Sequence, residues 1–158
     1  NKTSKLSIDL GEQGAATAFK TFNLTYKDTG LFGAYLTCAD NKAEDAMWYT
    51  LHNMVRLAHK TTDGEVEYAK IALKAKLVAE LGTNSGVAGD LAGSLSNYGR
   101  AVSLAETFAR VDAVTAADIR ETASKFINDE DHALAGIGQI FELPDYNWIR
   151  RRSYWLRY

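Results

Sequence analysis

The sequence predicts an α+β fold, in which helices pack on one antiparallel sheet. Three features support this class: an early strand–turn–strand pattern, a middle part made of helical segments, and one late strand-like segment. A strand that follows several helices has to pair with a strand far away in the sequence, which is typical of α+β proteins. A hairpin and one strand make a thin sheet, because about three strands are the minimum for independent stability. We therefore expect further strands from outside this chain.

The first two elements are a short helix and a hairpin. Residues 4–14, SKLSIDLGEQG, fit a helix that is closed by its glycines. In residues 17–40, β-forming residues lie on both sides of the turn sequence KDTG, as in two antiparallel strands. This hairpin is the expected core of the sheet.

Helical patterns fill the middle of the chain. Residues 41–60 have apolar side chains at helical spacing, and Asn41 with Glu44 predicts a capping box at the start. A second box, Thr62 to Glu65, predicts the start of the next helix. That helix is expected to continue to residue 81, with Gly82 as its C-cap, and a helix rich in small residues follows at 86–98. Two further helices, near 103–110 and 115–128, are expected to start at Ser103 and Thr115. A strand at 132–140 and a short helix from Pro144 or Asp145 are the last elements.

Composition excludes several functional classes. The 158 residues are 46% apolar and 24% charged, as in an ordinary globular domain. A net charge of −2 argues against nucleic acid as the main partner. The longest uncharged stretches, such as 29–39 and 133–141, are too short for a membrane span. The chain starts with Asn1 instead of methionine, so we expect either that residues were removed or that it begins within a larger protein.

The residues able to do chemistry do not form a recognisable site. His52 and His59 are about 10 Å apart along one helix, too far to share one zinc ion, so these histidines and His132 are interpreted as surface or packing residues. The single cysteine, Cys38, excludes an internal disulfide and is predicted to be a buried structural thiol. The carboxylate clusters DNKAED and NDEDH are interpreted as solvated helix caps, and the glycine pairs lack the context of a nucleotide site.

The last sixteen residues, LPDYNWIRRRSYWLRY (143–158), are aromatic and basic. Arginine and tryptophan are the anchors that protein interfaces use, so protein contact is favoured over lipid headgroups and RNA. On a continuous helix, Trp148, Arg151 and Trp155 would share one face, and Ile149, Arg152 and Leu156 another. The interface candidates are Trp148, Arg151, Arg152, Trp155 and Tyr158.

These closing residues also carry a family resemblance. LPDYNWIRRRSYWLRY resembles the carboxyl terminus of beta-type subunits in the mitochondrial processing peptidase family, which are pitrilysin-like zinc metallopeptidases. The same family supplies the first core subunit of ubiquinol–cytochrome c reductase, respiratory complex III. The segments TSKL, AFKTFNLTYKDTGLFGAYLTCAD, EVEYAKIALKAKLVAEL, ARVDAVTAADIRETASKFI and ALAGIGQI appear in the family's order. The resemblance therefore covers nearly the whole chain.

The resemblance implies the processing-peptidase (LuxS-like metallohydrolase) fold, and only the carboxyl-terminal portion of a subunit. Residues 1–158 are expected to form a peptidase-like domain, made of the final subdomain and part of the one before, and incomplete without the preceding part. The family's zinc site, an inverted H-x-x-E-H helix with a further glutamate, belongs to the amino-terminal half. Some relatives add an arginine and a tyrosine seven residues apart, but Gly11 and Ala18 stand there when the SKL segments are aligned. We therefore expect no catalytic, metal-binding or cofactor-binding residue in this chain.

Two related functions follow from the resemblance. The first is a structural and assembly role in a complex III core subunit, on the matrix side of the mitochondrial inner membrane. The alternative is the carboxyl-terminal part of a processing peptidase beta subunit, which helps to enclose the zinc site that cleaves presequences; in some lineages one protein is expected to do both. A free-standing matrix binding module is a distant third. The expected partners are the amino-terminal portion of the same subunit, a second core or alpha-type subunit and other complex III subunits, with anionic lipid as a minor alternative for the arginines.

Overall fold

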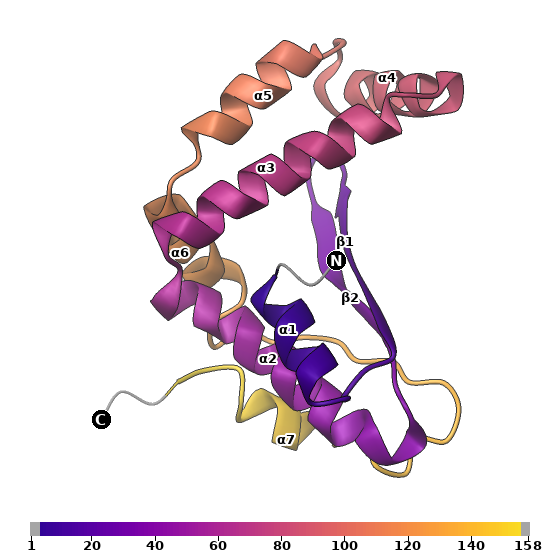
Figure 1. The fold of residues 1–158 in the computed structure, drawn as a ribbon, viewed down its shortest axis with the longest axis vertical. Helices are drawn as coiled ribbons and strands as arrows, with labels where there is room; N and C mark the ends of the chain where they lie inside the picture. The colour runs from indigo at the N-terminus through magenta and orange to yellow at the C-terminus, as the bar shows by residue number, and fades with distance from the viewer. Residues whose placement is uncertain (1–3, 156–158) are drawn as a thin grey trace. The chain divides into compact units, whose positions relative to one another are not determined.

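The computed structural model describes residues 4–155, and Figure 1 shows their arrangement as a ribbon. In chain order the elements are α1 (Lys5–Glu12), β1 (Ala18–Thr25), β2 (Gly30–Thr37), the short 3-10 helix η1 (Asp40–Lys42), α2 (Ala43–Lys60), α3 (Asp63–Glu80), α4 (Asn84–Tyr98), α5 (Leu104–Ala113), α6 (Ala116–Phe126) and α7 (Tyr146–Arg150). Strands β1 and β2 pair as a hairpin, and within the described residues they form a two-stranded sheet. The α+β class predicted from the sequence is confirmed.

The chain divides into two compact units. The first unit contains Asn1–Lys20, Ala34–Thr62 and Ala116–Tyr158, and the second contains Thr21–Gly33 and Asp63–Thr115. The hairpin contributes to both, because its base belongs to the first unit and its tip to the second.

Helix α2 is the centre of the first unit. It packs against α6 and α1, and Val55 on its buried face is 1% exposed. Leu10 of α1 is also 1% exposed, and a hydrogen bond from Asn53 Nδ2 to Asp9 Oδ2 (2.8 Å) joins the two helices. Burial raises the pKa of Asp9, but the bonds from Asn53 and Lys5 outweigh it and leave that pKa below its usual value. The first unit therefore has an apolar core with a polar tie beside it.

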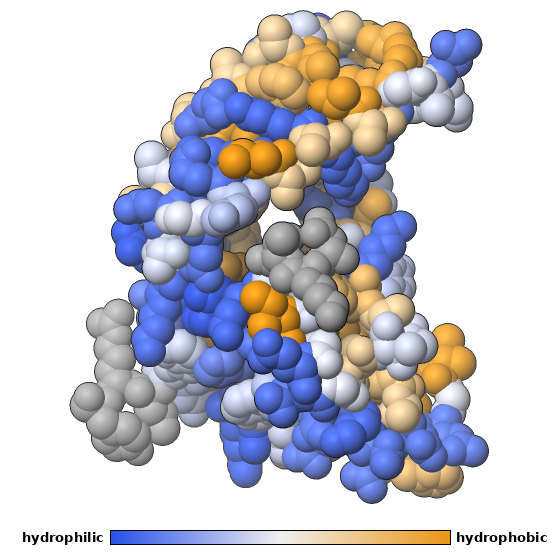
Figure 2. Space-filling model, in the orientation of Figure 1, coloured by the Kyte–Doolittle hydropathy of each residue, from blue (hydrophilic) through white to orange (hydrophobic). Residues whose placement is uncertain are grey.

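The second unit has little core. Helices α3 and α5 pack together, and the Lys74 side chain of α3 pairs with Asp112 of α5. Val66 is the one buried apolar side chain of this unit among the described residues. Other large apolar side chains of its helices are exposed, and Figure 2 shows apolar residues gathered over α4. The most exposed are Tyr68 (70%), Ile71 (66%), Tyr98 (58%) and Leu95 (55%).

Most helix boundaries agree with the sequence signals, with one exception. Ser103 begins α5 as predicted, since its Oγ accepts a hydrogen bond from the Glu106 N–H at 3.2 Å. The predicted capping box of Asn41 and Glu44 is wrong. Asn41 lies inside η1, and α2 begins at Ala43 without a side-chain cap. Because the chain already turns through η1, Asn41 lacks the extended backbone that an N-cap residue needs.

The predicted strand at 132–140 is wrong for the chain in this structure. These residues are neither strand nor helix, and Gly138 has φ +116°, which interrupts any extended run. A strand forms only where a neighbouring backbone supplies hydrogen-bond partners. Neither strand of the hairpin takes this segment as a neighbour.

Two smaller expectations concern Cys38 and membrane spans. Cys38 follows β2 as a free thiol and is half-buried, so it is less buried than predicted. Within residues 4–155, every helix is too short or too polar to cross a bilayer.

Candidate interaction site at the carboxyl-terminal strip

The carboxyl-terminal strip, defined here as residues 143–155, is held to the first unit by one short helix. Asp145 caps α7, because its Oδ1 accepts a hydrogen bond from the Trp148 N–H at 2.7 Å. Ile149 in the next turn is fully buried, at 0% exposed. The strip is therefore anchored in the core of the same chain, and α7 supplies the anchor.

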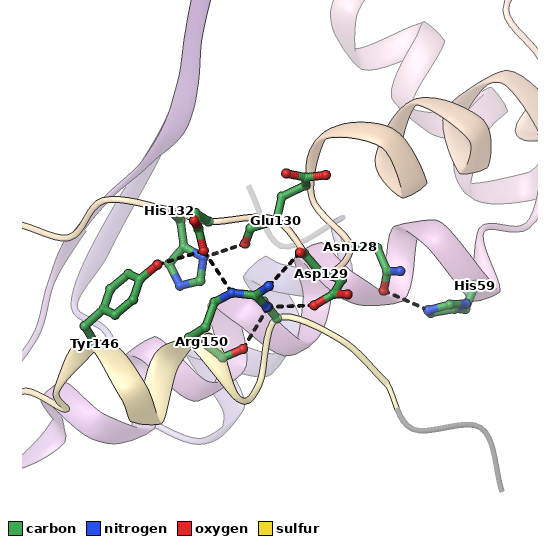
Figure 3. Close-up of polar contacts among 9 residues, drawn as sticks. His59, Asn128, Asp129, Glu130, His132, Tyr146 and Arg150 are labelled. Atoms are coloured by element: carbon green, nitrogen blue, oxygen red, sulfur yellow. Dashed lines mark hydrogen bonds and ion pairs between the residues drawn. The ribbon is translucent and has the colours of Figure 1, made fainter.

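Arg150 makes the main polar contacts of the strip (Figure 3). Its Nη1 donates to Asp129 Oδ1 at 2.8 Å, and its Nε donates to Asp131 Oδ1 at 2.9 Å. Nη1 also donates to Ser153 Oγ at 2.6 Å, and Nη2 donates to the Asp129 carbonyl oxygen at 2.9 Å. The planar guanidinium suits this arrangement, because its donors have fixed directions. We call Arg150, Asp129, Asp131 and Ser153 the arginine clamp.

The backbone completes the clamp. The Asp129 N–H donates to the Ser153 carbonyl oxygen at 2.8 Å, and Asp129 has φ +62°, which aspartate tolerates better than most residues. Ser153 is 2% exposed, so this tie is largely shielded from water. The clamp therefore joins the loop after α6 to the turn after α7.

The charges within the clamp stabilise one another. The hydrogen bonds to Asp129, ahead of those to Asp131, raise the pKa of Arg150. The Tyr146 hydroxyl donates to Asp131 Oδ1 at 2.8 Å, and this bond, followed by Arg150, lowers the pKa of Asp131. The same bond raises the pKa of Tyr146. These shifts favour the charged forms of Asp131 and Arg150 and the neutral form of Tyr146, which adjoins the clamp.

Trp155 lies between two histidines of α2. Its ring centroid is 5.3 Å from that of His52 and 5.3 Å from that of His59, with interplanar angles of 32° and 18°. His52 also stacks on Trp48, at 5.0 Å and 8°. Histidines two helical turns apart are about 10 Å from each other along the axis, which is room for one aromatic ring. We call Trp48, His52, Trp155 and His59 the aromatic column.

Two polar contacts flank the aromatic column. Lys60 Nζ lies 5.3 Å from the Trp155 ring centroid, within the range of a cation–π contact. His59 Nε2 lies 3.2 Å from Asn128 Oδ1, which links α2 to the loop after α6 (Figure 3). Burial lowers the pKa of His52, so the column favours neutral imidazole at that position.

The structure separates the interface candidates instead of aligning them. Helix α7 ends at Arg150, so the faces expected from a continuous helix do not form. Arg152 folds back over Trp148, with its guanidinium 3.7 Å from the ring centroid, and Trp155 enters the aromatic column. Arg151 is exposed, whereas Tyr158 and Leu156 lie outside the described residues. Whether these residues contact another protein stays a prediction.

Sequence reasoning missed the acidic half of the clamp. The cluster NDEDH, interpreted as solvated caps, contains Asp129 and Asp131, which bind Arg150. The sequence did contain a signal for this pairing, because the acidic cluster is followed, after a stretch of loop length, by a strongly basic segment. No three His, Cys, Asp or Glu side chains gather as a metal site in the part of the chain that the structure describes.

Comparison with known proteins gives consistent matches along the chain. Residues 1–73 match the family model described as "Peptidase M16 inactive domain". Over 143 residues the chain is 41% identical to the probable mitochondrial-processing peptidase subunit beta of Arabidopsis thaliana, covering 90% of this chain and 27% of that protein. Over 141 residues it is 40% identical to the human cytochrome b-c1 complex subunit 1, covering 89% of this chain and 29% of that protein.

A solved structure matches as well. A chain of complex III2 from Candida albicans, with Inz-5 bound, superimposes with a TM-score of 0.89 at 28% sequence identity. The match covers 96% of this chain and 36% of that one. The chain therefore spans about a third or less of the length of these relatives.

Proposed function

The chain belongs to the family of mitochondrial processing peptidase beta subunits and cytochrome b-c1 complex core subunits, and from this we propose that it is the non-catalytic carboxyl-terminal part of a complex III core subunit. In this role it contributes to structure and assembly on the matrix side of the mitochondrial inner membrane. The catalytic zinc site of the wider family would belong to the amino-terminal portion of the subunit.

One observation carries the proposal: the superposition on a chain of complex III with a TM-score of 0.89 over 96% of this chain. A match of this extent covers nearly the whole chain. The exposed apolar side chains of the second unit support the same role, because large apolar side chains that gather at a surface often mark protein contact. The partners we propose are the amino-terminal portion of the same subunit, a second core subunit and other subunits of the complex.

A processing peptidase beta subunit is the second candidate. The 41% identity to the Arabidopsis protein supports it as well as the 40% identity to the human b-c1 subunit supports the first. In this role the chain would help to enclose a site where zinc-activated water attacks the presequence. Gly11 and Ala18 stand where some relatives have an arginine and a tyrosine. This chain would therefore help to shape the enclosure of the site and would make no contact with the transition state.

One purification distinguishes the two functions. The chain carries an affinity tag in its native organism, and mitochondria are separated into soluble and detergent-extracted membrane fractions. If it is a core subunit, it co-purifies from the membrane with ubiquinol–cytochrome c reductase activity. If it is a processing peptidase subunit, it is recovered as a soluble heterodimer that cleaves a presequence peptide. Recovery in a complex with neither activity would contradict both proposals.

A further inference from the structure

The carboxyl-terminal strip has two attachments to the first unit, and they differ in chemistry. The arginine clamp holds the strip by hydrogen bonds of Arg150, one of them to Ser153, which is 2% exposed. Two residues later, Trp155 is held by ring contacts with His52 and His59. The clamp can therefore stay closed while Trp155 leaves α2.

The surroundings of His52 carry more positive than negative charge. The charged groups that act on its imidazole are Asp9 and Lys5 of α1 and Arg56 and Lys60 of α2, while the strip contributes the neutral ring of Trp155. The one carboxylate among these groups is already engaged, because Asp9 pairs with Lys5 at 3.0 Å and accepts the hydrogen bond of Asn53 at 2.8 Å. A proton on His52 would therefore add positive charge where cations are already in excess.

A charged His52 keeps an aromatic partner without Trp155. Its ring is stacked on Trp48 at 5.0 Å and 8°, a closer and more parallel contact than the 5.3 Å and 32° to Trp155. Either indole attracts an imidazolium, so this attraction remains at Trp48 after Trp155 leaves, and the charged ring regains water on the side that Trp155 covered. Burial lowers the pKa of His52, which agrees with this direction. Protonation of His52 therefore favours release of Trp155.

His59 is the comparison within the same aromatic column. Its ring centroid is also 5.3 Å from that of Trp155, at 18°. Its Nε2 lies 3.2 Å from Asn128 Oδ1, an amide carbonyl oxygen, so Nε2 carries a hydrogen and donates. Neutral and charged imidazole can both make this bond. His59 is therefore expected to hold Trp155 in either state, which leaves His52 as the histidine that responds to pH.

We propose that the carboxyl-terminal strip is a pH-sensitive strap, in which neutral His52 holds Trp155 against α2 and protonated His52 releases it while the arginine clamp stays closed. The strap is closed above the ordinary histidine pKa of about 6.5, and below it release presents the Trp155 ring to water or to a partner. The clamp stays charged over this range, because the pKa of Asp131 is lowered and that of Arg150 is raised. The inference goes beyond the proposed function and holds for either of the two candidate functions.

Fluorine NMR on the dilute full chain, labelled with fluorotryptophan, measures the exposure of each tryptophan. The Trp155 signal is assigned by its loss in Trp155→Phe, and its shift between light and heavy water reports contact with solvent. From pH 8 to about pH 5 we expect this isotope shift to rise at least about twofold for Trp155 and to stay constant for Trp148, which Arg152 covers. No change at Trp155, or full exposure already at the highest pH, would overturn the inference.

Two matched variants locate the response. His52→Phe keeps a ring in the aromatic column that takes up no proton, so Trp155 should stay protected down to about pH 5. His59→Phe should leave the response to pH as it is in the native chain. A response that persists in His52→Phe, or one that vanishes in His59→Phe, would overturn the inference.

A second measurement leaves His52 unchanged, and it decides the question even where His52→Phe does not fold. The pKa of His52, followed by NMR of its ring protons, should be higher in Trp155→Leu than in the native chain. The reason is that linkage is reciprocal: if the proton weakens the contact with Trp155, that contact weakens proton binding. An equal or lower pKa in Trp155→Leu would overturn the inference.

Discussion

The two units of the chain contain similar helices but differ in how far the apolar side chains of those helices are buried. In the first unit α2 is covered by α1, α6 and the strip, and apolar side chains such as Leu10, Val55 and Ile149 are buried. In the second unit α3 and α4 are equally regular, yet Ile71 and Leu95 are largely exposed. Capping and helix propensity alone set where these helices begin and end, but a core needs a second layer to cover the apolar side. The comparison shows that regular helices alone do not bury apolar side chains, and that the helices of the second unit leave theirs exposed.

The largest expected effect concerns the chain expressed alone. We expect it to self-associate, because the second unit exposes apolar side chains and the hairpin has unpaired edges. Sedimentation velocity over a concentration series measures this. A monodisperse chain with one cooperative unfolding transition would contradict the prediction and the contrast between the units.

A matched pair of isoleucines tests the contrast by mutation. Ile149→Ala, in the core of the first unit, should lower the free energy of unfolding by about 2–5 kcal/mol. Ile71→Ala, at a site 66% exposed in the second unit, should change it by less than about 0.5 kcal/mol. Urea unfolding at low protein concentration, followed by tryptophan fluorescence, reports on the first unit, which contains all three tryptophans. Similar losses for both variants would remove the distinction between the units.

A third prediction concerns the strip as a docking surface. Trp155→Ala should weaken assembly more than any single arginine change, by about 2 kcal/mol, because buried aromatic side chains dominate interfaces. Part of this loss comes from the aromatic column, which holds the strip against α2 before any partner binds. Retention in the purified complex is compared with Arg151→Ala, which removes an exposed side chain. An Arg151 variant with the greater loss would favour charge over the aromatic anchor.

The smallest effect is a pH dependence of the aromatic column. The pKa of His52 in the folded chain is lowered by burial, so the unfolded chain takes up the proton first as pH falls. The contribution of His52 is therefore complete above the ordinary histidine pKa of about 6.5 and is lost as pH falls below it. Asp9 favours the charged imidazole, whereas Arg56, Lys60 and Lys5 oppose it. Unfolding free energy measured from pH 8 to about pH 5 should decline in the native chain, and this decline should be smaller in His52→Phe.

Local elements of the fold were predictable from the sequence, whereas long-range contacts were not. The Ser103 signal and the terminal helix capped by Asp145 were placed correctly, because a cap depends on residues three positions apart. The predicted cap at Asn41 was wrong, because the 3-10 turn around this residue removes the backbone geometry that a cap requires. The segment 132–140 has the composition of a strand, but strand formation depends on a neighbour that composition does not specify.

The candidate site shows the same division. Sequence composition identified Trp148, Arg152 and Trp155 as anchor types, and it separated His52 and His59 by the distance that excludes a shared zinc. Only the tertiary structure decided that Trp155 occupies the space between those histidines. The pairing of Arg150 with Asp129 and Asp131, across about twenty residues, was likewise decided only by the tertiary structure, although the sequence contained both charged segments.

By itself, the sequence determined the class of fold, the family and most helices of this protein. These follow from periodicity, caps and motif order, which are properties of residues close together in the chain. The tertiary structure decided which apolar faces are covered, where the strip docks and which strand-like segment stays unpaired. Those outcomes depend on contacts between distant residues, and for the second unit and residues 132–140 we expect the contacts to lie in the rest of the subunit.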